Sequence, residues 1–400
     1  MKEVTRRGFL TVAGTAPLGL VVPRHLLTDL VTKRAASVGG FDPWLEINLE
    51  HLAWNLSEVR RRVSNRPVMV VIKANAYGHG LVGVARFLET QNVRHFAVGK
   101  VQEALSLRAN GITSTILNFG PFAQEEAVEL VGLDASQSVY SDAVDMLAAA
   151  ARRLNKRARV HIKVDSGLGR VGVPYYEAGP FIERVASMPE ILIEGVFMTF
   201  TEDPEFDRVQ LDRFLRVCDA AAQKGISLGL RHAASSAAVA TFPESFLDMV
   251  RPGDAIYGLE PLPNLDLRPV MSLKTRVIYV KRLRPGDAVS YHRRFTAERE
   301  TLVATLPLGY SDGYPPQAVD NGQVLIQGRR WPLIAAVTAN HSTVDVSGAE
   351  ALKIGDEVVL FGEQGDEELT IGEVADWAGS SVYKVAIGMN PTLPRVNLEA

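Results

Sequence analysis

The sequence has little that would mark a disulfide-rich, nucleic-acid-binding or membrane-embedded protein. Its single cysteine, Cys218, excludes an internal disulfide and any metal cluster held by several cysteines. The 43 basic residues nearly balance the 46 acidic ones, so no overall field of one sign recruits nucleic acid or an anionic membrane. Hydrophobic residues fill 46% of the 400 positions, enough to bury a sizeable core. We therefore expect a globular protein that acts on a small molecule, with Cys218 as a buried thiol in an apolar helical pattern.

The N-terminus lacks an apolar run that spans a bilayer comfortably, but it carries a basic pair. In "TRRGFLTVAGTAPLGLVV", Arg6 and Arg7 precede Phe9-Leu10 and an apolar run broken by Gly and Pro. The pattern resembles a twin-arginine signal, which exports folded proteins, and it predicts a leader over residues 1–37 and a periplasmic location. There is no clean A-x-A cleavage site, so cleavage near Lys33 to Ser37 and an uncleaved membrane anchor both stay open.

Short β-rich runs alternate with helix-like stretches over most of the chain. Eight such runs predict a closed (β/α)8 TIM barrel, an α/β fold, over residues 52–270. From about Met271 the chain is strand-dense and turn-rich, which predicts a mostly β C-terminal domain over residues 271–400. Residues 44–51 are predicted to be a strand that joins this β domain. The eight runs are "VMVVIKA", "HFAVGK", "STILNFG", "SQSVYS", "RVHIKVDSG", "LIEGVFMTF", "LGLRHAASS" and "MVRPGDAIYG".

One lysine, Lys73, ends the first of these runs, immediately ahead of a turn rich in Gly, Asn, Tyr and His. In barrel enzymes the chemistry lies at the C-terminal ends of the strands, where this side chain would point. Such a lysine either forms a salt bridge or, where a desolvated site keeps its amine neutral, attacks a carbonyl to form a Schiff base. No second histidine or carboxylate stands at ligand spacing around His79 or His232, so no metal site is predicted.

The residues around Lys73 resemble the pyridoxal-phosphate attachment motif of alanine racemases. Further motifs of that family follow in the family's order, and together they span almost everything after the leader. An ordered series is far more specific than one lysine motif. The resemblance implies a pyridoxal 5'-phosphate-dependent isomerase of the amino-acid racemase type, with a barrel and a β domain. The motifs are "WLEINLEHLAWNL", "VIKANAYGHG", "KVDSGLGRVG", "HAASSAAV", "MVRPGDAIYG", "VSYHRRFTA" and "LPRV".

The resemblance assigns roles around the cofactor ring. It implies that Lys73 carries the cofactor as a Schiff base and acts as one base. Arg251 would face the pyridine nitrogen, where a guanidinium makes the ring a weaker electron sink than an aspartate would and so discourages side reactions. Arg170 would hydrogen-bond the phenolic oxygen and help to bind substrate. Lys163 would lie beside Arg170; the family often carbamylates this lysine, and an ordinary lysine reaching a nearby acid is the alternative.

The same resemblance assigns residues to the cofactor phosphate. Ser236, the backbone amides around Gly253 and Asp254, and the hydroxyls of Tyr77 and Tyr383 would hold it. Loops after the seventh and eighth strands are the usual phosphate site of a barrel. Each tyrosine by itself is equally compatible with a half-buried structural aromatic.

Racemisation needs a proton removed from one face of Cα and another delivered to the opposite face. Tyr291 resembles the family's second catalytic residue, which reaches the site from the neighbouring subunit, so a homodimer with shared active sites is implied. A free tyrosine has a pKa of about 10, and bringing it near neutrality requires roughly 4 kcal/mol of preferential phenolate stabilisation. The backbone amide of Ala339 would bind the substrate carboxylate.

Three positions depart from the family pattern. Thr199 stands where the family usually has a histidine against the cofactor ring, and threonine can neither stack nor carry charge. Thr338-Ala339-Asn340 replaces the family's "CMD" loop and loses the charge of its aspartate. Asp254 replaces an apolar residue of the phosphate loop, where its carboxylate must point away from the phosphate or repel it.

These observations predict a two-base amino-acid racemase with alanine as the default substrate. The export signal and the altered loop favour a broader amino-acid preference. Two alternatives stay open. One is another fold-type III enzyme, a decarboxylase or a D-amino-acid aldolase, although the decarboxylases usually carry a cysteine in the second domain, where this chain has none. The other is a non-catalytic descendant that binds the cofactor or an amino acid.

Overall fold

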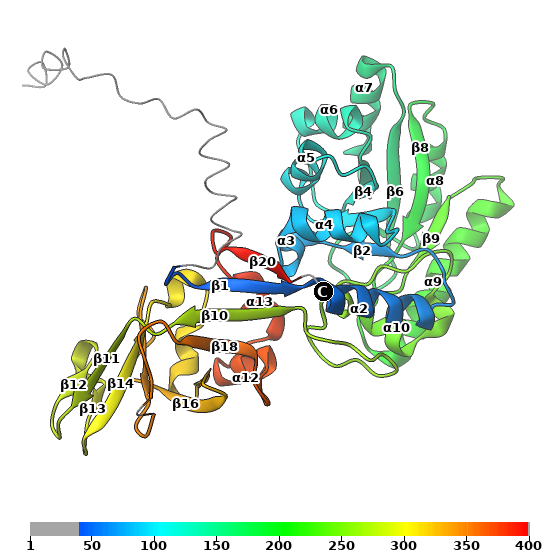
Figure 1. The fold of residues 1–400 in the computed structure, drawn as a ribbon. Helices are drawn as coiled ribbons and strands as arrows, with labels where there is room; N and C mark the ends of the chain where they lie inside the picture. Colours follow the sequence, from blue (N-terminus) through cyan, green and yellow to red (C-terminus); the bar gives the residue numbers. More distant parts are fainter. Residues whose placement is uncertain (1–39, 350, 399–400) are drawn as a thin grey trace, which may run out of the picture. The chain divides into compact units, whose positions relative to one another are not determined.

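The computed structural model describes residues 40–349 and 351–398, and Figure 1 displays their arrangement. The predicted leader over residues 1–37 lies outside the described residues. From Phe41 onward the described chain belongs to one unit, in which a β/α region is followed by a β-rich region. No helix among these residues is both long and apolar enough to cross a lipid bilayer.

The β/α region is built on a curled parallel sheet. Its described strands follow the order β2-β3-β4-β5-β6-β8-β9, and every neighbouring pair is parallel. Most strand residues are buried, as expected for a parallel sheet covered by helices. The strands are β2 (Met69–Val71), β3 (His95–Val98), β4 (Thr115–Asn118), β5 (Ser136–Val139), β6 (Ala158–Asp165), β8 (Ile191–Phe197) and β9 (Leu230–His232), and the short β7 (Val173–Pro174) pairs with β6.

The sheet closes through the run predicted as the eighth strand. Within it, Met249 bridges to His232 and Val250 bridges to Val68, both in parallel sense. These bridges join β9 to the start of β2, so the barrel is closed as expected. The eighth strand is short: Pro252, two residues after Val250, has no backbone N–H to donate to a neighbouring strand, although its carbonyl accepts from the Val71 amide at 2.9 Å.

Helices between the strands cover the barrel with amphipathic faces. In α7, for example, Val144, Leu147, Ala148 and Ala151 are buried at spacings of three and four residues, so one stripe of the helix faces the sheet. The helical segments of this region are α2 (Leu49–Arg62), α3 (Lys73–Tyr77), α4 (Leu81–Thr90), α5 (Val101–Ala109), α6 (Gln124–Gly132), α7 (Val144–Leu154), α8 (Ala178–Ala186), α9 (Pro204–Gln223), α10 (Ser236–Thr241), η2 (Pro243–Ser245) and α11 (Asp254–Tyr257).

The lone cysteine lies on the inner face of α9. Cys218 is buried there, and burial raises the pKa of its thiol to about 12. At neutral pH it is therefore a thiol and not a thiolate, and the sequence-based prediction of a structural cysteine is confirmed.

The β-rich region is a second sheet that also takes in the first strand of the described chain. β1 pairs antiparallel with β10 and parallel with β20, and the order is β11-β14-β17-β16-β15-β18-β10-β1-β20, with β19 beside β18. Along β10 alternate residues are buried, the pattern of a strand with one face on a core. The strands are β1 (Trp44–Asn48), β10 (Met271–Arg276), β11 (Tyr279–Leu283), β14 (Thr301–Leu306), β15 (Gln323–Ile326), β16 (Arg329–Ile334), β17 (Ser342–Asp345), β18 (Glu357–Gln364), β19 (Glu367–Leu369) and β20 (Arg395–Leu398); β12 (Ala288–Val289) and β13 (Phe295–Thr296) form a separate hairpin; the helical segments are η3 (Tyr291–Arg293), η4 (Tyr310–Asp312), η5 (Pro316–Asp320), α12 (Ile371–Trp377) and α13 (Val382–Gly388).

Two elements of the β region pack against the turn that follows β2. A Cβ on Gly78 would lie 2.0 Å from the carbonyl oxygen of Ala386 in α13, and Gly78 has a φ of +87°, so only glycine fits here. Arg395 of β20 donates from Nε to the Gly78 carbonyl oxygen at 2.8 Å. The β region therefore fixes the backbone next to Lys73.

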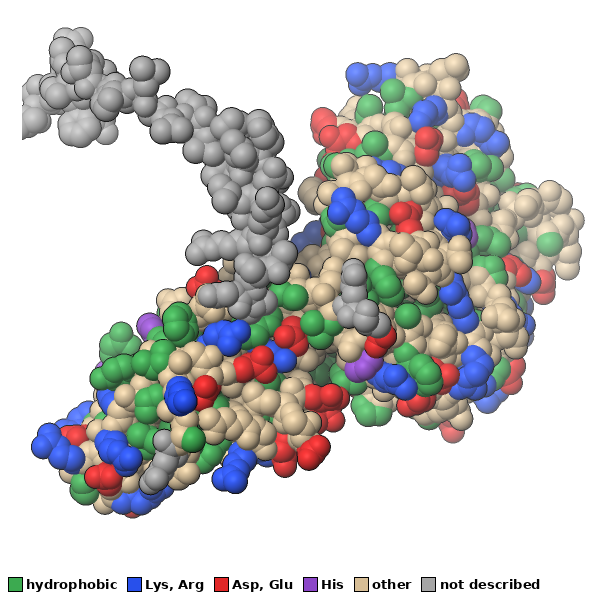
Figure 2. Space-filling view, viewed as in Figure 1, with side chains coloured by type: hydrophobic (Ala, Val, Ile, Leu, Met, Phe, Trp, Pro, Cys, Tyr) green, Lys and Arg blue, Asp and Glu red, His purple; other side chains and the backbone are tan. Residues whose placement is uncertain are grey.

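Charged side chains of both signs are interspersed on the face of the molecule in Figure 2. This agrees with the near balance of 43 basic and 46 acidic residues in the sequence. We therefore look for functional electrostatic effects among individual charged groups at the mouth of the barrel and not in the net charge of the surface.

Candidate active site

Lys73 begins a left-handed turn at the C-terminal end of β2. The four residues after it, Ala74 to Tyr77, have φ values of 53°, 57°, 53° and 51°. For L-residues this conformation costs roughly 1–2 kcal/mol per residue, so the surrounding structure must hold it. Gly78 donates its amide to the Ala74 carbonyl at 3.0 Å, and Gly80 donates to the Asn75 carbonyl at 2.9 Å. The turn places the Lys73 and Tyr77 side chains at the barrel mouth.

Glu103 of α5 secures this turn from the next βα unit. Its carboxylate accepts hydrogen bonds from the amides of Asn75, at 3.1 Å, and Gly99, at 2.9 Å. The Asn75 side chain in turn accepts from the Leu81 amide at 2.8 Å. The sequence analysis missed Glu103 because a glutamate in the first turn of an ordinary helix carries no signal of its own.

The Lys73 amine lies among charges of both signs. Its side chain reaches solvent at the mouth, and its Nζ lies 5.8 Å from the centre of the Tyr77 ring. Partial burial and then the Arg170 guanidinium lower the pKa of Lys73, while the carboxylates of Glu103 and Asp254 oppose that effect. The surroundings thus favour the neutral amine more than water does, as a nucleophilic lysine requires.

Arg251 begins a buried hydrogen-bonded chain behind the site. This guanidinium is 5% exposed, and burial lowers its pKa to about 9, which leaves it charged at neutral pH. It donates to Nδ1 of His232 at 2.9 Å, and because arginine has no acceptor, His232 must carry its proton on Nε2. That nitrogen lies 2.8 Å from Nδ1 of His161, so His232 donates onward to His161. Arg251 also donates to the Met198 carbonyl at 2.7 Å, which fixes its orientation.

Acid is expected to destabilise the protein through its buried histidines. Burial lowers the pKa of His79 and of His161 to about 4 and lowers that of His232 well below the usual value. Between about pH 4 and 6.5 the unfolded chain binds protons that the native chain does not, so the free energy of unfolding rises with pH across this window. A shift to about 4 corresponds to on the order of 3 kcal/mol each for His79 and His161, lost as the pH falls.

Urea unfolding at a series of pH values measures this effect. His161→Gln should reduce the slope of the unfolding free energy against pH, whereas the same change at the exposed His341 should leave the slope as it is. Equal slopes for the two variants would contradict the assignment.

Lys163 of β6 contacts Thr199, which lies two residues beyond the end of the neighbouring strand β8. Lys163 is 7% exposed and donates to the Thr199 hydroxyl oxygen at 3.0 Å. Burial, then the charges of Arg251 and Arg170, lower the pKa of Lys163 to about 7. Its Nζ also lies 4.7 Å from the centre of the Phe197 ring. Arg170 itself is exposed on the loop after β6. Because the pKa of Lys163 is about 7, a substantial fraction of its amine is neutral near pH 7.

The phosphate residues expected from the sequence gather at the ends of β9 and of the eighth strand segment. Ser236 is 2% exposed, and its Oγ accepts hydrogen bonds from the amides of Gly253, at 3.0 Å, and Ala255, at 3.2 Å. A Cβ on Gly253 would lie 2.5 Å from the Tyr77 hydroxyl, so Gly253 brings that hydroxyl close to the loop backbone. Burial raises the pKa of Tyr77, which keeps its hydroxyl a proton donor.

Tyr383 approaches the same loop from α13 of the β region. Its hydroxyl donates to Oε1 of Glu260 at 3.0 Å, and its ring lies 6.3 Å from that of Tyr77. Burial raises the pKa of Tyr383, and the charges of Asp254 and Glu260 raise it further. Sequence reasoning missed Glu260, which stands 123 residues away from Tyr383 in the chain.

Two of the expected site residues lie in the β region, apart from this cluster. Tyr291, in η3, is 77% exposed. Ala339 is half-buried, and its carbonyl accepts hydrogen bonds from the backbone and hydroxyl of Ser311 at 3.0 and 2.7 Å. Asn340 also donates to the Ser311 hydroxyl, at 2.8 Å. Within the described residues, no hydrogen bond joins Tyr291 or Ala339 to the cluster around Lys73.

Comparisons with known proteins match both regions. Residues 47–261 match the family described as alanine racemase, N-terminal domain, and residues 270–397 match alanine racemase, C-terminal domain. The alanine racemase of Desulforamulus reducens is 38% identical over 365 residues, covering 88% of this chain and 98% of that protein. The alanine racemase of Clostridium tetani is 35% identical over 366 residues, covering 88% of this chain and 94% of that protein.

Solved structures agree with the sequence matches. The alanine racemase of Clostridium difficile 630 has a TM-score of 0.86 at 32% identity, covering 90% of this chain and 96% of that chain. The alanine racemase of Bacillus anthracis, solved with bound L-Ala-P, has a TM-score of 0.83 at 28% identity, covering 91% of this chain and 96% of that chain.

Proposed function

Because this chain belongs to the alanine racemase family, we propose that it interconverts the L and D forms of alanine with pyridoxal 5'-phosphate as its cofactor. The observation that carries the proposal is the grouping of Lys73, the buried Arg251 and the Ser236–Gly253 loop at one end of the barrel. These residues come from the first, seventh and eighth strand segments. They suit three parts of pyridoxal phosphate: its aldehyde carbon, its pyridine nitrogen and its phosphate.

The residues present fit this cofactor. At the phosphate end, Ser236 and the hydroxyls of Tyr77 and Tyr383 offer donors, and an added Cβ on Gly253 would run into the Tyr77 hydroxyl. Asp254 follows Gly253 directly and contributes its backbone amide. Behind the ring, Arg251 would face the pyridine nitrogen, its charge retained and its position fixed by His232. Lys73 would bind the aldehyde carbon.

Pyridoxal phosphate, when bound, withdraws electrons from the substrate Cα and so makes the Cα proton removable. Lys73 supplies a base on one side, and its lowered pKa brings the amine closer to the neutral form that accepts a proton. Arg170 would hold the phenolic oxygen and the substrate carboxylate. Lys163 lies close enough to Arg170 for the two charges to interact, and its partner here is Thr199 in place of the family's histidine.

The second base is Tyr291 of a partner subunit in this proposal. In one chain Tyr291 is exposed on a short helical turn of the β region, where a second copy can cover it. Ala339 would reach the same shared site and bind the substrate carboxylate through its amide. A homodimer with two shared active sites follows.

The loop Thr338 to Asn340 is proposed to widen the amino-acid preference. Its Asn340 is neutral and exposed, and it is held by Ser311. A neutral loop repels anionic side chains less than one that carries an aspartate. Amino acids with acidic side chains are therefore expected to be accepted alongside alanine.

The test follows Cα exchange and enantiomer ratio together. Leaderless protein, reconstituted with pyridoxal phosphate, is incubated in deuterated water with a panel of L-amino acids. Deuterium incorporation with inversion is the expected result for alanine. Activity on alanine alone would refute the broader preference, and bound cofactor without exchange on any amino acid would refute the racemase itself.

We also propose that the protein is exported by the twin-arginine route. The support is the Arg6-Arg7 pair and the apolar run that follows it, which precede the region matched by the family. A folded export route suits a chain that must acquire its cofactor before it crosses the membrane. Fractionation of cells should place the protein in the periplasm, and Arg6→Lys together with Arg7→Lys should retain it in the cytoplasm; equal distribution of the two forms would exclude this route.

Carbamylation of Lys163 is the last element of the proposal. A neutral amine is needed to bond with CO2, and burial supplies it by lowering the pKa of Lys163 to about 7. The amine nitrogen would bond to the carbon of CO2 and release one proton to water, and the resulting carbamate anion would turn the repulsion between Lys163 and Arg170 into an attraction. A carbon-13 carbamate signal from protein grown with labelled bicarbonate is expected, and it should be absent from Lys163→Ala.

A further inference from the structure

We propose that Glu260 competes with the cofactor phosphate for the hydroxyl proton of Tyr383 and thereby weakens the hold of this protein on its cofactor. The proposal rests on the function proposed above, in which Tyr383 is one of the phosphate donors. It concerns a carboxylate that the catalytic steps do not use.

Carboxylates stand beside the Tyr383 hydroxyl and can accept its one proton: Glu260, which accepts it here, and Asp254, whose side chain also lies within hydrogen-bonding reach. A tyrosine hydroxyl has a single O–H, and here it donates to Oε1 of Glu260 at 3.0 Å. To donate to a phosphate oxygen, Tyr383 must give up this bond. The Ser236 and Tyr77 hydroxyls have no carboxylate partner among the hydrogen bonds of the described residues, so the competition falls on Tyr383 alone.

The negative charges beside Tyr383 oppose phosphate binding, as does the hydrogen bond from Tyr383 to Glu260. The carboxylates of Glu260 and Asp254 both lie close enough to Tyr383 for their charges to raise its pKa. A phosphate brought to the same hydroxyl enters the field of these two negative groups, and like charges at close range oppose one another. Within the described residues, Glu260 forms no ion pair with a basic side chain that would offset this repulsion.

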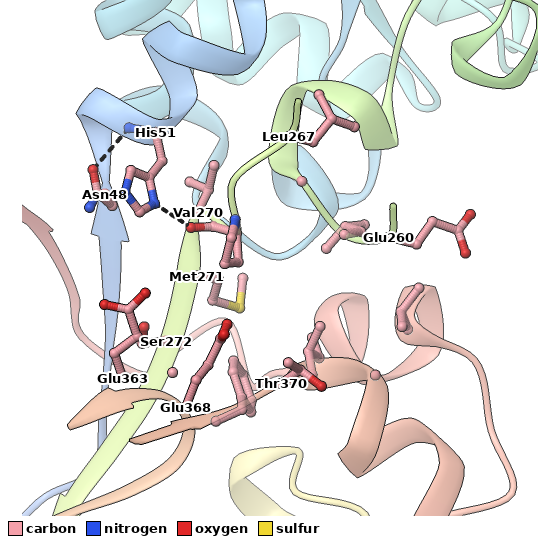
Figure 3. A pocket seen from close by; sticks show the side chains of 18 of the residues that line it. Asn48, His51, Glu260, Leu267, Val270, Met271, Ser272, Glu363, Glu368 and Thr370 are labelled. Carbon is pink, nitrogen blue, oxygen red and sulfur yellow. Dashed lines mark hydrogen bonds between the residues drawn. The ribbon is translucent and has the colours of Figure 1, made fainter. Parts of the chain in front are cut away.

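Glu260 is also open to water from outside the cofactor site. It stands in the wall of a cavity of about 730 Å³ between the barrel and the β region, and Figure 3 places it at one edge, away from His51 and Glu363. Val382, the neighbour of Tyr383, lines the same cavity. Because water can solvate Glu260 there, its carboxylate does not depend on the Tyr383 hydroxyl as a hydrogen-bond donor. Replacing Glu260 should therefore leave no buried polar group without a partner.

The experiment measures cofactor affinity of the full-length protein and not its turnover. Holoenzyme is dialysed to equilibrium against graded pyridoxal phosphate, and the retained cofactor is read from its visible absorbance. Glu260→Gln, which keeps the shape of the side chain, and Glu260→Ala should each lower the dissociation constant about tenfold, the scale of one hydrogen bond to a charged group. The matched variant Glu363→Gln removes a charge from the same cavity wall and should leave the constant unchanged.

Two controls separate this mechanism from others. Binding of pyridoxal, which lacks the phosphate, should be the same in all variants. In a Tyr383→Phe background, Glu260→Gln should have a clearly smaller effect, because the competition for the hydroxyl proton is gone and only the charge repulsion between Glu260 and the phosphate remains. An unchanged affinity for pyridoxal phosphate in both Glu260 variants, or an equal gain in the Tyr383→Phe background, would overturn the proposal. A wild-type protein that binds no pyridoxal phosphate would instead refute the proposed function.

Discussion

Replacing Lys73 with alanine is expected to abolish racemisation and to change the way the cofactor is held. Lys73 is assigned both the covalent attachment and one of the two proton transfers, and removing a positioned base alone costs about 10²–10⁴-fold in rate. Because both roles disappear together, a loss of at least about 10⁴-fold is expected. The measurement is kcat for alanine in both directions, together with the visible spectrum of the reconstituted protein, which should lose the band of lysine-bound cofactor.

The control for Lys73→Ala is the same substitution at Lys281, which lies exposed on β11. It should leave rate and spectrum unchanged. Both variants should unfold at the urea concentration of the wild type, since Lys73 reaches solvent and donates no hydrogen bond to other described residues. A Lys73→Ala protein with wild-type rate and spectrum would exclude Lys73 as the attachment site.

Replacing Tyr291 with phenylalanine is expected to separate proton exchange from racemisation. Without a base on the second face, inversion should fall by about 10²–10⁴-fold in both directions. Lys73 can still remove and return a proton on its own face, so one enantiomer of alanine should continue to exchange its Cα proton with deuterated water and retain its configuration. Deuterium incorporation and enantiomer ratio, measured on each enantiomer separately, check this expectation.

Mixing the two inactive variants tests where Tyr291 acts. If each site takes Lys73 from one chain and Tyr291 from its partner, a hybrid dimer of Lys73→Ala and Tyr291→Phe contains one intact site. Activity should then return when the two proteins are unfolded together and refolded, and not when each is refolded alone. A mixture that stays inactive although hybrid dimers form would mean that no site is shared.

The fold followed from local patterns in the sequence. Alternating apolar strands and amphipathic helices predicted the barrel, and the dense strands after Met271 predicted the β region, because hydrophobic periodicity is a property of neighbouring residues. Two details differed. The strand predicted over residues 44–51 ends at Asn48, because the Asn48 side chain caps α2, which already begins at Leu49. The eighth barrel strand is reduced to the bridges of Met249 and Val250, since Pro252 has no N–H to donate, although its carbonyl still accepts from the Val71 amide at 2.9 Å.

The candidate site followed from the sequence only in part. The motifs located Lys73, Arg251 and Ser236, because a family motif keeps residue type and order together. They gave no indication of Glu103, His161 or Glu260. Each of these is an ordinary residue of a helix, strand or loop when read alone, and each gains its role from a group that is distant in the chain, 28 residues away for Glu103 and Asn75 and 123 for Glu260 and Tyr383.

By itself the sequence determined the order of strands and helices, the apolar faces that pack them, and the chemical types of the groups at the barrel mouth. The tertiary structure decided how those groups behave. Packing of α13 and β20 on Gly78 holds the strained turn at Lys73, and burial makes Lys163 partly neutral and keeps His161 and His232 neutral near pH 7. Strain and desolvation depend on which atoms surround a group, and those atoms come together only when distant segments of the chain fold against one another.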